Sequence, residues 1–288
     1  MTAHIIDGKK IAEDLRSKIK DDVGTLATQG KKVGLAVILV GDDPASHVYV
    51  GSKIKACEEV GIQSFEHRMD ETATEQDIRH VIKNLNQNPD VHGILLQLPL
   101  PHHLAEMQES LVQMIAPEKD VDGLTTVNGG KLFLGHPDGL VPCTPQGSLL
   151  LIKSVEKNLS GKNAVVIGRS NLFGKPMAQL LLQENCTVTI AHSRTQNLAS
   201  VCKQADILVA AVGRPEMVKA DWVKKDAIVI DVGINRLSPT EEKPKGRLVG
   251  DVDYAAVKDI ASAITPVPGG VGPMTITCLL ANTVKAAK

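Results

Sequence analysis

The sequence predicts an α/β protein of two three-layer αβα domains, with an interdomain cleft. Three observations support this. Short apolar runs rich in branched residues alternate with helical stretches, which is the pattern of parallel strands joined by crossover helices. The alternation occurs twice, on either side of a Gly-, Pro- and Asp-rich segment at 120–145. The chain has 288 residues, a length that suits two domains rather than one.

The first series of elements precedes this segment. Residues 34–40 read GLAVILV, a run typical of a strand buried on both faces. Asp43-Pro44 and Thr74 are helix-start signals, because a capping side chain and an early proline both favour the first turn. The predicted elements are, in order, a helix at 9–29, a strand at 34–40, a helix at 44–60, a strand at 62–67, a helix at 74–86, a strand at 92–98 and a helix at 104–115.

The second series follows the junction. A helix is expected at 144–156, because Thr144-Pro145 places a cap before a proline. The elements after it are a strand at 163–167, a helix at 174–183, a strand at 187–191, a helix at 198–204, strands at 207–211, 227–232 and 250–252, and a helix at 274–288. The polar segment 237–245 and the Pro/Gly-rich segment 264–273 are expected to be loops.

The composition argues against several classes of function. Lys and Arg number 32 against 33 Asp and Glu, and only three Phe, two Tyr and one Trp occur, so a nucleic-acid surface is not expected. No apolar run approaches the ~20 residues that span a bilayer, and the first residues lack a signal-peptide core. The five cysteines form no CxxC pair, and no histidines have metal-ligand spacing. We expect a cytoplasmic protein with buried reduced thiols, no membrane contact and no metal.

A glycine-bearing loop follows the strand at 163–167. It runs from Gly168-Arg169-Ser170 to Gly174, where a helix begins. A tight turn of this kind brings backbone N–H groups and a helix N-terminus to a pyrophosphate. Ser170 replaces the usual second glycine, and the spacing is longer by one residue. The loop alone therefore fits a nucleotide site and an ordinary polar turn equally.

The ends of the following strands add weight to the nucleotide site. Ser193 and Arg194 follow the strand at 187–191, where enzymes that use NAD commonly carry an acid. A hydroxyl and a cation suit the 2′-phosphate of NADP, although a polar loop on a solvated sheet edge would look the same. Gly213 and Ile234 lie just after further strands, whose carboxyl ends line the ligand crevice of an open sheet. The second domain is therefore predicted to be a Rossmann-like NADP-binding domain.

Candidate catalytic residues lie in the first domain. Tyr49 and Lys53 are four residues apart on a predicted helix and share a face. A desolvated lysine does proton chemistry, but the spacing alone favours an exposed lysine beside a partly buried tyrosine. Gln97 lies near the carboxyl end of a strand. Asp122, in the next loop, suits either an amino-pyrimidine edge or turn chemistry.

Taken together, these motifs resemble the bifunctional methylenetetrahydrofolate dehydrogenase/cyclohydrolase family. They span nearly the whole chain in the family's order, and the last is especially specific. The matching segments are 49–53 (YVGSK), 56–61 (ACEEVG), 97–101 (QLPLP), 119–123 (KDVDG), 142–145 (PCTP), 168–170 (GRS), 231–235 (DVGIN) and 265–275 (TPVPGGVGPMT). The departure is Leu172-Phe173, where the family more often carries smaller aliphatic residues.

The resemblance implies roles for the residues above. Lys53 is the general acid/base, Gln97 assists it, Tyr49 packs on the folate ring, and Asp122 holds the pterin amino edge. The further substrate contacts implied are Pro268, Gly269 and Gly270. The NADP contacts implied are Gly168, Arg169, Ser170, Ser193, Arg194, Gly213, Ile234 and Thr275. The substrates are tetrahydrofolate one-carbon derivatives, and hydride passes to NADP between rings stacked across the interdomain cleft before water attacks the methenyl product.

The resemblance also implies a homodimer of two-domain subunits. The catalytic domain spans 1–140, with the C-terminal helix 274–288 packed back on it, and the NADP-binding domain spans 141–273. Three alternatives stay open: a monofunctional methylenetetrahydrofolate dehydrogenase, with NAD as a possible cofactor; a non-catalytic NADP- or folate-binding protein; and an NADP-dependent amino-acid or shikimate-type dehydrogenase.

Overall fold

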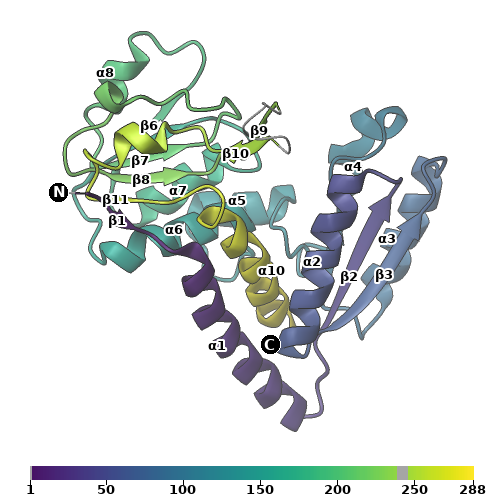
Figure 1. Ribbon diagram of the computed structural model, residues 1–288. Helices are drawn as coiled ribbons and strands as arrows, with labels where there is room; N and C mark the ends of the chain where they lie inside the picture. The colour runs from purple at the N-terminus through teal and green to yellow at the C-terminus, as the bar shows by residue number, and fades with distance from the viewer. Residues whose placement is uncertain (1, 239–245) are drawn as a thin grey trace. The chain divides into compact units, whose positions relative to one another are not determined.

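The computed structural model describes residues 2–238 and 246–288, which form two compact units (Figure 1). The small-sheet unit comprises Glu13–Cys143 and Ile276–Lys288, and the large-sheet unit comprises Met1–Ala12 and Thr144–Thr275. The chain passes from the small-sheet unit to the large-sheet unit between Cys143 and Thr144. The first residues differ from expectation, because strand β1 (His4–Ile5) pairs with β11 (Ala263–Ile264) in the large sheet.

The small-sheet unit contains a parallel sheet of three strands in the order β3-β2-β4. Its strands are β2 (Gly34–Val40), β3 (Gln63–Met69) and β4 (Gly93–Leu96). Successive side chains of β2 point to opposite faces, so Val37 belongs to one core and Ile38 to the other. This alternation confirms the predicted three-layer arrangement.

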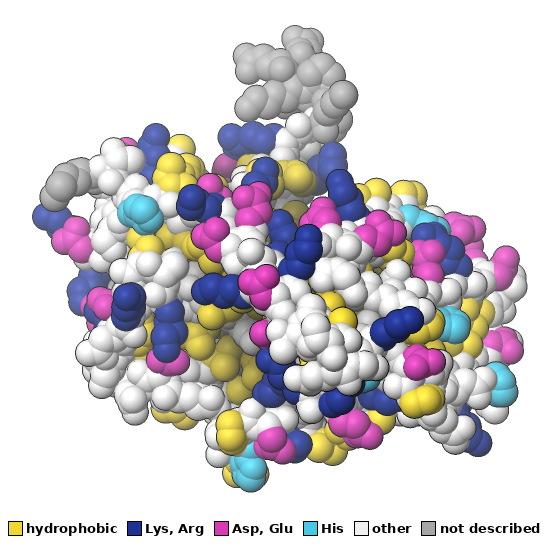
Figure 2. Space-filling model, turned by 90° about the horizontal axis from the view of Figure 1, so that it is seen from below, with side chains coloured by type: hydrophobic (Ala, Val, Ile, Leu, Met, Phe, Trp, Pro, Cys, Tyr) yellow, Lys and Arg dark blue, Asp and Glu magenta, His cyan; other side chains and the backbone are white. Residues whose placement is uncertain are grey.

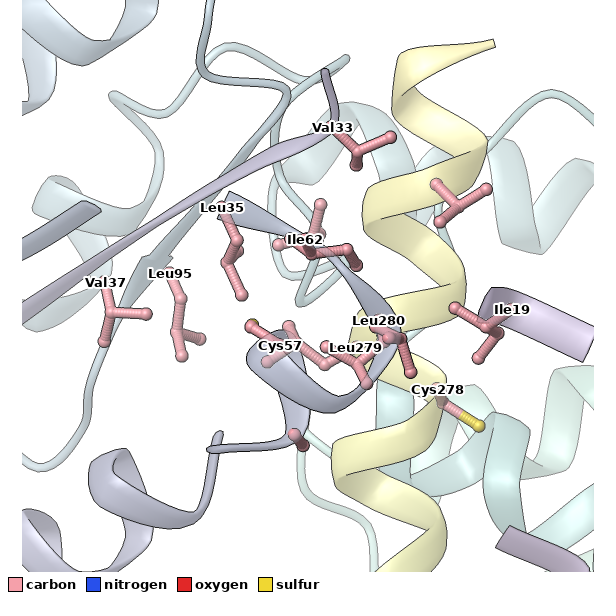
Figure 3. Close-up of a cluster of buried hydrophobic side chains, with 14 of the residues drawn as sticks. Ile19, Val33, Leu35, Val37, Cys57, Ile62, Leu95, Cys278, Leu279 and Leu280 are labelled. Carbon is pink, nitrogen blue, oxygen red and sulfur yellow. The ribbon is translucent and has the colours of Figure 1, made fainter. Parts of the chain in front are cut away.

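Helices cover both faces of this sheet. The first core, part of which Figure 3 shows, contains residues of α1 (Gly8–Thr28), α2 (Pro44–Val60) and α10 (Val271–Ala287). The second core contains residues of α3 (Glu75–Gln87), η1 (His102–Met107) and α4 (Gln108–Val112). Figure 1 shows α2 and α3 on opposite sides of the sheet. Cys278, Leu279 and Leu280 of α10 are buried here, so the last helix packs on the small-sheet unit.

Two elements of this unit differ from the prediction. The expected helix at 104–115 is divided into η1 and the short α4. A further helix, α5 (Thr126–Leu134), lies inside the Gly-, Pro- and Asp-rich segment at 120–145, where no helix was predicted over these residues. Thr125 caps α5 by accepting a hydrogen bond from the Asn128 N–H, and Gly135 ends it in the left-handed region. Two glycines inside the helix lower its propensity and conceal it from sequence patterns.

The large-sheet unit contains a parallel sheet of six strands in the order β1-β11-β8-β7-β5-β6. The chain moves from β5 to β6 on one side and then returns to β7 on the other. This change of direction places a ligand crevice at the carboxyl ends of β5 and β7. The remaining bounds are β5 (Asn163–Ile167), β6 (Thr187–Ala191), β7 (Ile207–Ala210), β8 (Ile228–Asp231), α6 (Cys143–Val155), α7 (Gly174–Gln183), α8 (Leu198–Cys202), η2 (Ala220–Trp222) and α9 (Tyr254–Val257).

An antiparallel ribbon replaces the strand expected at 250–252. It pairs β9 (Asn235–Leu237) with β10 (Arg247–Val249). The expected loop at 237–245 begins as β9 ends, and its residues 239–245 lie outside the described part. In the described ranges no helix has the length and apolar character needed to cross a bilayer. Acidic and basic side chains are interspersed over the face shown in Figure 2.

Candidate active site and cofactor pocket

Helix α2 presents Tyr49 and Lys53 on one face. The Asp43 carboxylate caps the helix by accepting from the Ser46 N–H at 2.8 Å, and Pro44 occupies its first turn. The Lys53 Nζ lies 4.6 Å from the centroid of the Tyr49 ring, within cation–π range. Lys53 is only 5% exposed. The exposed-lysine interpretation is therefore wrong, because other segments of the unit enclose this side chain.

Gln97 meets Lys53 from the neighbouring strand. It directly follows β4, and its backbone N–H donates to the Ile38 carbonyl at 2.9 Å, which fixes its position at the end of the sheet. The Gln97 Oε1 accepts from the Lys53 Nζ at 2.9 Å, while the Gln97 Nε2 donates to the Leu98 carbonyl at 2.5 Å. Both polar ends of this buried amide are therefore paired, and its orientation is set.

Asp122 completes the group from the next loop. Burial lowers the pKa of Lys53 below its usual value, and the negative charge of Asp122 opposes this effect. Burial likewise raises the pKa of the Asp122 carboxyl, which the Lys53 charge opposes and the nearby Asp120 reinforces. The Cys143 thiol, which donates to the Val121 carbonyl at 3.3 Å, lies close to the Asp122 carboxyl. Shifts of this kind bring an amine and a carboxyl closer to neutral pH, as proton-transfer chemistry requires.

The two acids of this loop have different surroundings. The Asp120 carboxylate accepts from the Leu124 and Thr125 N–H groups at 3.1 and 2.8 Å and from the Asn128 amide at 2.9 Å, which holds the turn together. Turn chemistry therefore explains Asp120. The Asp122 carboxyl instead lies close enough to Lys53 and Cys143 for its charge to act on both.

A pocket of about 710 Å³ opens at the carboxyl edge of the large sheet. It lies where the change in strand direction places a ligand crevice. The residues that line it lie at the end of β5 or in the segments that follow β5, β6 and β7, including the start of α8 and η2. They are Ile167, Gly168, Arg169, Ser170, His192, Ser193, Thr195, Leu198, Ala211, Val212, Arg214, Met217 and Trp222.

The glycine loop of the pocket is built for close backbone approach. Gly168 has φ +127°, and a Cβ at this position would collide with the Ala211 carbonyl. A Cβ at Gly174 would collide with the Gly168 carbonyl. The Ser170 hydroxyl accepts from the N–H groups of Phe173 and Gly174 at 3.2 and 3.5 Å, so it closes the turn that leads into α7. Ser170 therefore replaces the usual glycine without loss of the tight turn.

The rim of the pocket is cationic. Arg169 and Arg214 line it, and no Asp or Glu is among its described lining residues. Ser193 also lines it, on a turn where the His192 N–H donates to the Thr195 hydroxyl at 2.9 Å. These residues fit NADP, because a phosphorylated ribose needs hydroxyl and cationic partners where an acid would repel it.

Several predicted cofactor residues lie outside this lining. Arg194 is exposed on the turn beside Ser193, and its N–H donates to the His192 ring at 3.2 Å. The Gly213 N–H is turned toward the Asp251 carboxylate at 3.0 Å. Ile234 is 65% exposed after β8, and the Thr275 hydroxyl lies 3.1 Å from that of Thr144. These assignments stay predictions.

The predicted substrate loop is also separate from the pocket. Pro268, Gly269 and Gly270 lie between β11 and α10. A Cβ on Gly8 would collide with the Gly270 carbonyl, so this loop packs closely on the start of α1. Its contact with folate stays a prediction.

Sequence reasoning missed some of the residues that build these sites. Arg214 follows β7 just after Gly213, and the rule that strand ends line the crevice would have identified it. No local signal marked Trp222, which lines the pocket from η2. Asn282 of α10 donates to the Val121 and Val141 carbonyls, both at 2.8 Å, and thereby braces the Asp122 loop.

Comparisons with known proteins agree with this arrangement. Residues 6–122 match the model of the tetrahydrofolate dehydrogenase/cyclohydrolase catalytic domain, and residues 142–288 match that of the family's NAD(P)-binding domain. The bifunctional protein FolD of Sphingopyxis alaskensis is 61% identical over 286 residues, 99% of this chain and 94% of its own. That of Rhodospirillum rubrum is 56% identical over 292 residues, 100% of this chain and 98% of its own.

Solved structures give the same result. The FolD enzyme of Campylobacter jejuni has 46% identity and a TM-score of 0.94, covering 99% of this chain and 98% of its own. The enzyme of Trypanosoma brucei was solved with NADP and an inhibitor. It has 35% identity and a TM-score of 0.92, and the match covers 100% of this chain and 98% of the Trypanosoma chain. The chain therefore belongs to the tetrahydrofolate dehydrogenase/cyclohydrolase family.

Proposed function

We infer that the chain is a bifunctional enzyme of one-carbon metabolism. It oxidises 5,10-methylenetetrahydrofolate to the methenyl form with NADP, and it hydrolyses the methenyl form to 10-formyltetrahydrofolate. Family membership over the full chain supports both activities. The observation that carries the catalytic assignment is the buried hydrogen bond of 2.9 Å between Lys53 and Gln97, with Asp122 beside it.

Lys53 is the proton carrier in the hydrolytic step. Its lowered pKa increases the fraction of neutral amine at physiological pH, so the Nζ can accept a proton from water as the new C–O bond forms at the cationic methenyl carbon. The hydroxyl proton of this adduct then moves to N5 while the C–N5 bond breaks, which leaves the formyl group on N10. One proton is released overall. Gln97 orients the amine through its fixed Oε1.

The remaining residues of the small-sheet unit hold the folate. The Asp122 carboxylate accepts hydrogen bonds from the pterin amino edge, because adjacent N–H donors suit its two oxygens. Tyr49 keeps 36% of its surface exposed, which leaves part of the ring available for stacking on the pterin. We assign further substrate contacts to the loop of Pro268, Gly269 and Gly270.

NADP supplies the hydride acceptor when it is bound. In the large-sheet unit, Gly168 and Ser170 bring backbone and hydroxyl groups to its pyrophosphate. Arg169 and Ser193 meet the phosphorylated ribose. We assign Arg194, Gly213, Ile234 and Thr275 to the outer contacts of the same site. The fit of this pocket rests on its glycine backbone and on its cationic rim.

We also propose that the enzyme is a cytoplasmic homodimer. The five cysteines are all free and buried, which suits a reducing compartment. Strand β6 lies at the edge of the large sheet, reads TVTIA and leaves Ile190 39% exposed. An edge without charge or proline favours pairing with another strand, and two copies of β6 satisfy twofold symmetry. An Ile190→Lys variant that kept the mass of the wild-type dimer in light scattering would exclude this edge as the interface.

A cofactor-resolved assay on the purified protein tests the two activities. 5,10-methylenetetrahydrofolate is supplied with NADP or NAD, and reduced cofactor and methenyltetrahydrofolate are recorded separately. Reduced NADP with little accumulation of the methenyl form, together with hydrolysis of added methenyltetrahydrofolate, is the expected result. Stoichiometric, persistent methenyltetrahydrofolate would show a monofunctional dehydrogenase. The absence of turnover by folded protein would indicate a binding protein.

A further inference from the structure

Two buried acids lie at the carboxyl edge of the large sheet and have no part in the mechanism above. Asp231 is the last residue of β8 and is 3% exposed, and Asp251 follows β10 and is fully buried. Within residues 2–238 and 246–288, no Lys or Arg side chain pairs with either carboxylate, and both accept hydrogen bonds from amide groups instead. A buried acid held in this way orders the backbone that surrounds it.

The Asp251 carboxylate accepts four hydrogen bonds. Its Oδ2 accepts from the N–H groups of Val212 and Gly213 at 2.6 and 3.0 Å. Its Oδ1 accepts from the Arg214 N–H at 2.8 Å and from the Asn235 side-chain amide at 2.9 Å. Three consecutive backbone donors therefore converge on one side chain. Two of these residues, Val212 and Arg214, line the cofactor pocket.

Asp231 holds Asp251 in place. The Asp231 carboxylate accepts from the N–H groups of Asp251 and Val252 at 2.8 and 2.9 Å, and the Asp231 N–H donates to the Thr265 hydroxyl at 2.8 Å. Burial raises the pKa of Asp231 to about 7, and these backbone hydrogen bonds oppose the rise. A Cβ on Gly250 would collide with the Asp231 carboxylate, so only glycine allows this approach.

We propose that Asp251 is a positioning residue for the cofactor, because its carboxylate fixes the loop of Val212, Gly213 and Arg214 that forms one wall of the pocket. The inference rests on the assignment of this pocket to NADP. Asp251 acts through the loop that it holds and has no direct contact with the reacting atoms.

The requirement is for a carboxylate specifically. All four partners of Asp251 are donors, and an ionised carboxylate is acceptor-only on both oxygens. Asparagine at this position has a single acceptor oxygen. Whichever way its amide is turned, two donors face an NH₂ group and lose their partner, which destabilises the wall of the pocket.

The Asp251→Asn substitution leaves the backbone hydrogen bonds of segment 250–253 in place. Three backbone hydrogen bonds, each of 2.9 Å, join it to the end of the pocket loop: Glu216 N–H to Gly250, Val218 N–H to Asp251, and Asp253 N–H to Val218. None of them involves the substituted side chain. We therefore expect the variant to fold, with the loss confined to the wall of the pocket.

Asp206→Asn is the matched control. Asp206 belongs to the same unit but precedes β7, at the opposite edge of the sheet. Its carboxylate accepts from the Asn163 N–H at 2.8 Å and from the Lys224 Nζ at 2.6 Å. The control removes the same charge from the same sheet without a change at the pocket.

The test measures NADPH binding and both activities for wild type and variants. Trp222 is the single tryptophan and lines the pocket, so its fluorescence reports binding directly. We expect Asp251→Asn to raise the Kd for NADPH and the KM for NADP by about tenfold or more, on the scale of one or two lost charge-assisted hydrogen bonds. Its hydrolysis of methenyltetrahydrofolate should stay within about twofold of wild type, since the small-sheet unit carries that step. Asp206→Asn should match wild type in all three values.

A folded Asp251→Asn variant that binds NADPH as tightly as wild type would overturn the proposal. A variant that loses NADPH binding and hydrolysis together, in proportion to a fall in its melting temperature, would also overturn it. If Asp251→Asn does not fold, Asp251→Glu replaces it. Glutamate keeps both acceptors one methylene further out, so weaker NADPH binding is expected and unchanged binding overturns the role. A wild-type protein that oxidises its folate substrate without binding NADPH near Trp222 would refute the pocket assignment, and the role of Asp251 with it.

Discussion

The hydrogen bond between Gln97 and Lys53 allows a test of the catalytic lysine by the sign of a pH shift. In Gln97→Glu a carboxylate replaces an amide of the same shape beside the ammonium group. In Gln97→Met the side chain keeps a similar volume and loses its acceptor. Both variants lose the donor to the Leu98 carbonyl, so they differ chiefly in their effect on the Lys53 charge. Gln97→Glu favours the charged form of Lys53, and Gln97→Met disfavours it.

The distance sets the magnitude. At the 2.9 Å between the Gln97 Oε1 and the Lys53 Nζ, two unit charges attract by about 6 kcal/mol at an effective dielectric constant of ~20 and by about 1.4 kcal/mol at ~80. This attraction favours the ammonium form, so the pKa of Lys53 is expected to be higher in Gln97→Glu than in the wild type. Gln97→Met should lower the same pKa, because the ammonium group loses a hydrogen-bond acceptor.

The assay is the pH profile of methenyltetrahydrofolate hydrolysis, corrected for the uncatalysed rate. Neutral Lys53 is the base, so the rate increases as pH rises through its pKa. We expect the increase to move to higher pH in Gln97→Glu, with at least a tenfold loss near pH 7, and to lower pH in Gln97→Met. Profiles that stay in place, or that move in the same direction in both variants, would refute Lys53 as the titrating base.

Three further predictions follow from other parts of the structure. Asn282→Leu removes two hydrogen bonds from the Asp122 loop, so it should lower the free energy of unfolding by about 1–3 kcal/mol, which denaturant titration will measure. It should also raise the KM for the folate substrate in both reactions, which steady-state kinetics will measure. Arg169→Ala should reduce the preference for NADP over NAD by about tenfold, because the pocket loses a phosphate partner; an unchanged ratio of the two kcat/KM values would assign the phosphate to Arg214. Burial raises the thiol pKa of Cys57 and of Cys278 to about 12, so thiol reagents at pH 8 should modify neither until the protein is unfolded, as mass spectrometry will detect.

The elements that sequence patterns predicted best are those with a strong local signal. The run GLAVILV forms β2 over the expected residues, because branched apolar side chains are needed on both faces of a central parallel strand. β1 and β9 were missed. They have two and three residues, too few for any periodicity, and they form because partner strands lie beside them.

The candidate site shows the same division between local and long-range information. The spacing of Tyr49 and Lys53 placed them on one helical face, and the structure confirms it with a cation–π contact. Spacing gave no reason to expect Lys53 to be buried, because its enclosure comes from other segments. Gln97 reaches it from β4, and Asp122 reaches it from the loop beyond. Only the family resemblance selected the functional interpretation over an exposed lysine.

The bracing of the Asp122 loop explains why this part resisted prediction. Asn282 is 161 residues from Val121 in sequence, yet its amide bonds the carbonyl there and that of Val141. A buried asparagine in a mostly apolar helix signals that some partner exists, since an unpaired amide in a core is costly. It does not identify the partner, because a carbonyl group is present at every residue. The motif residues of such a site can therefore be identified from sequence, whereas the contacts that orient them depend on packing between distant segments.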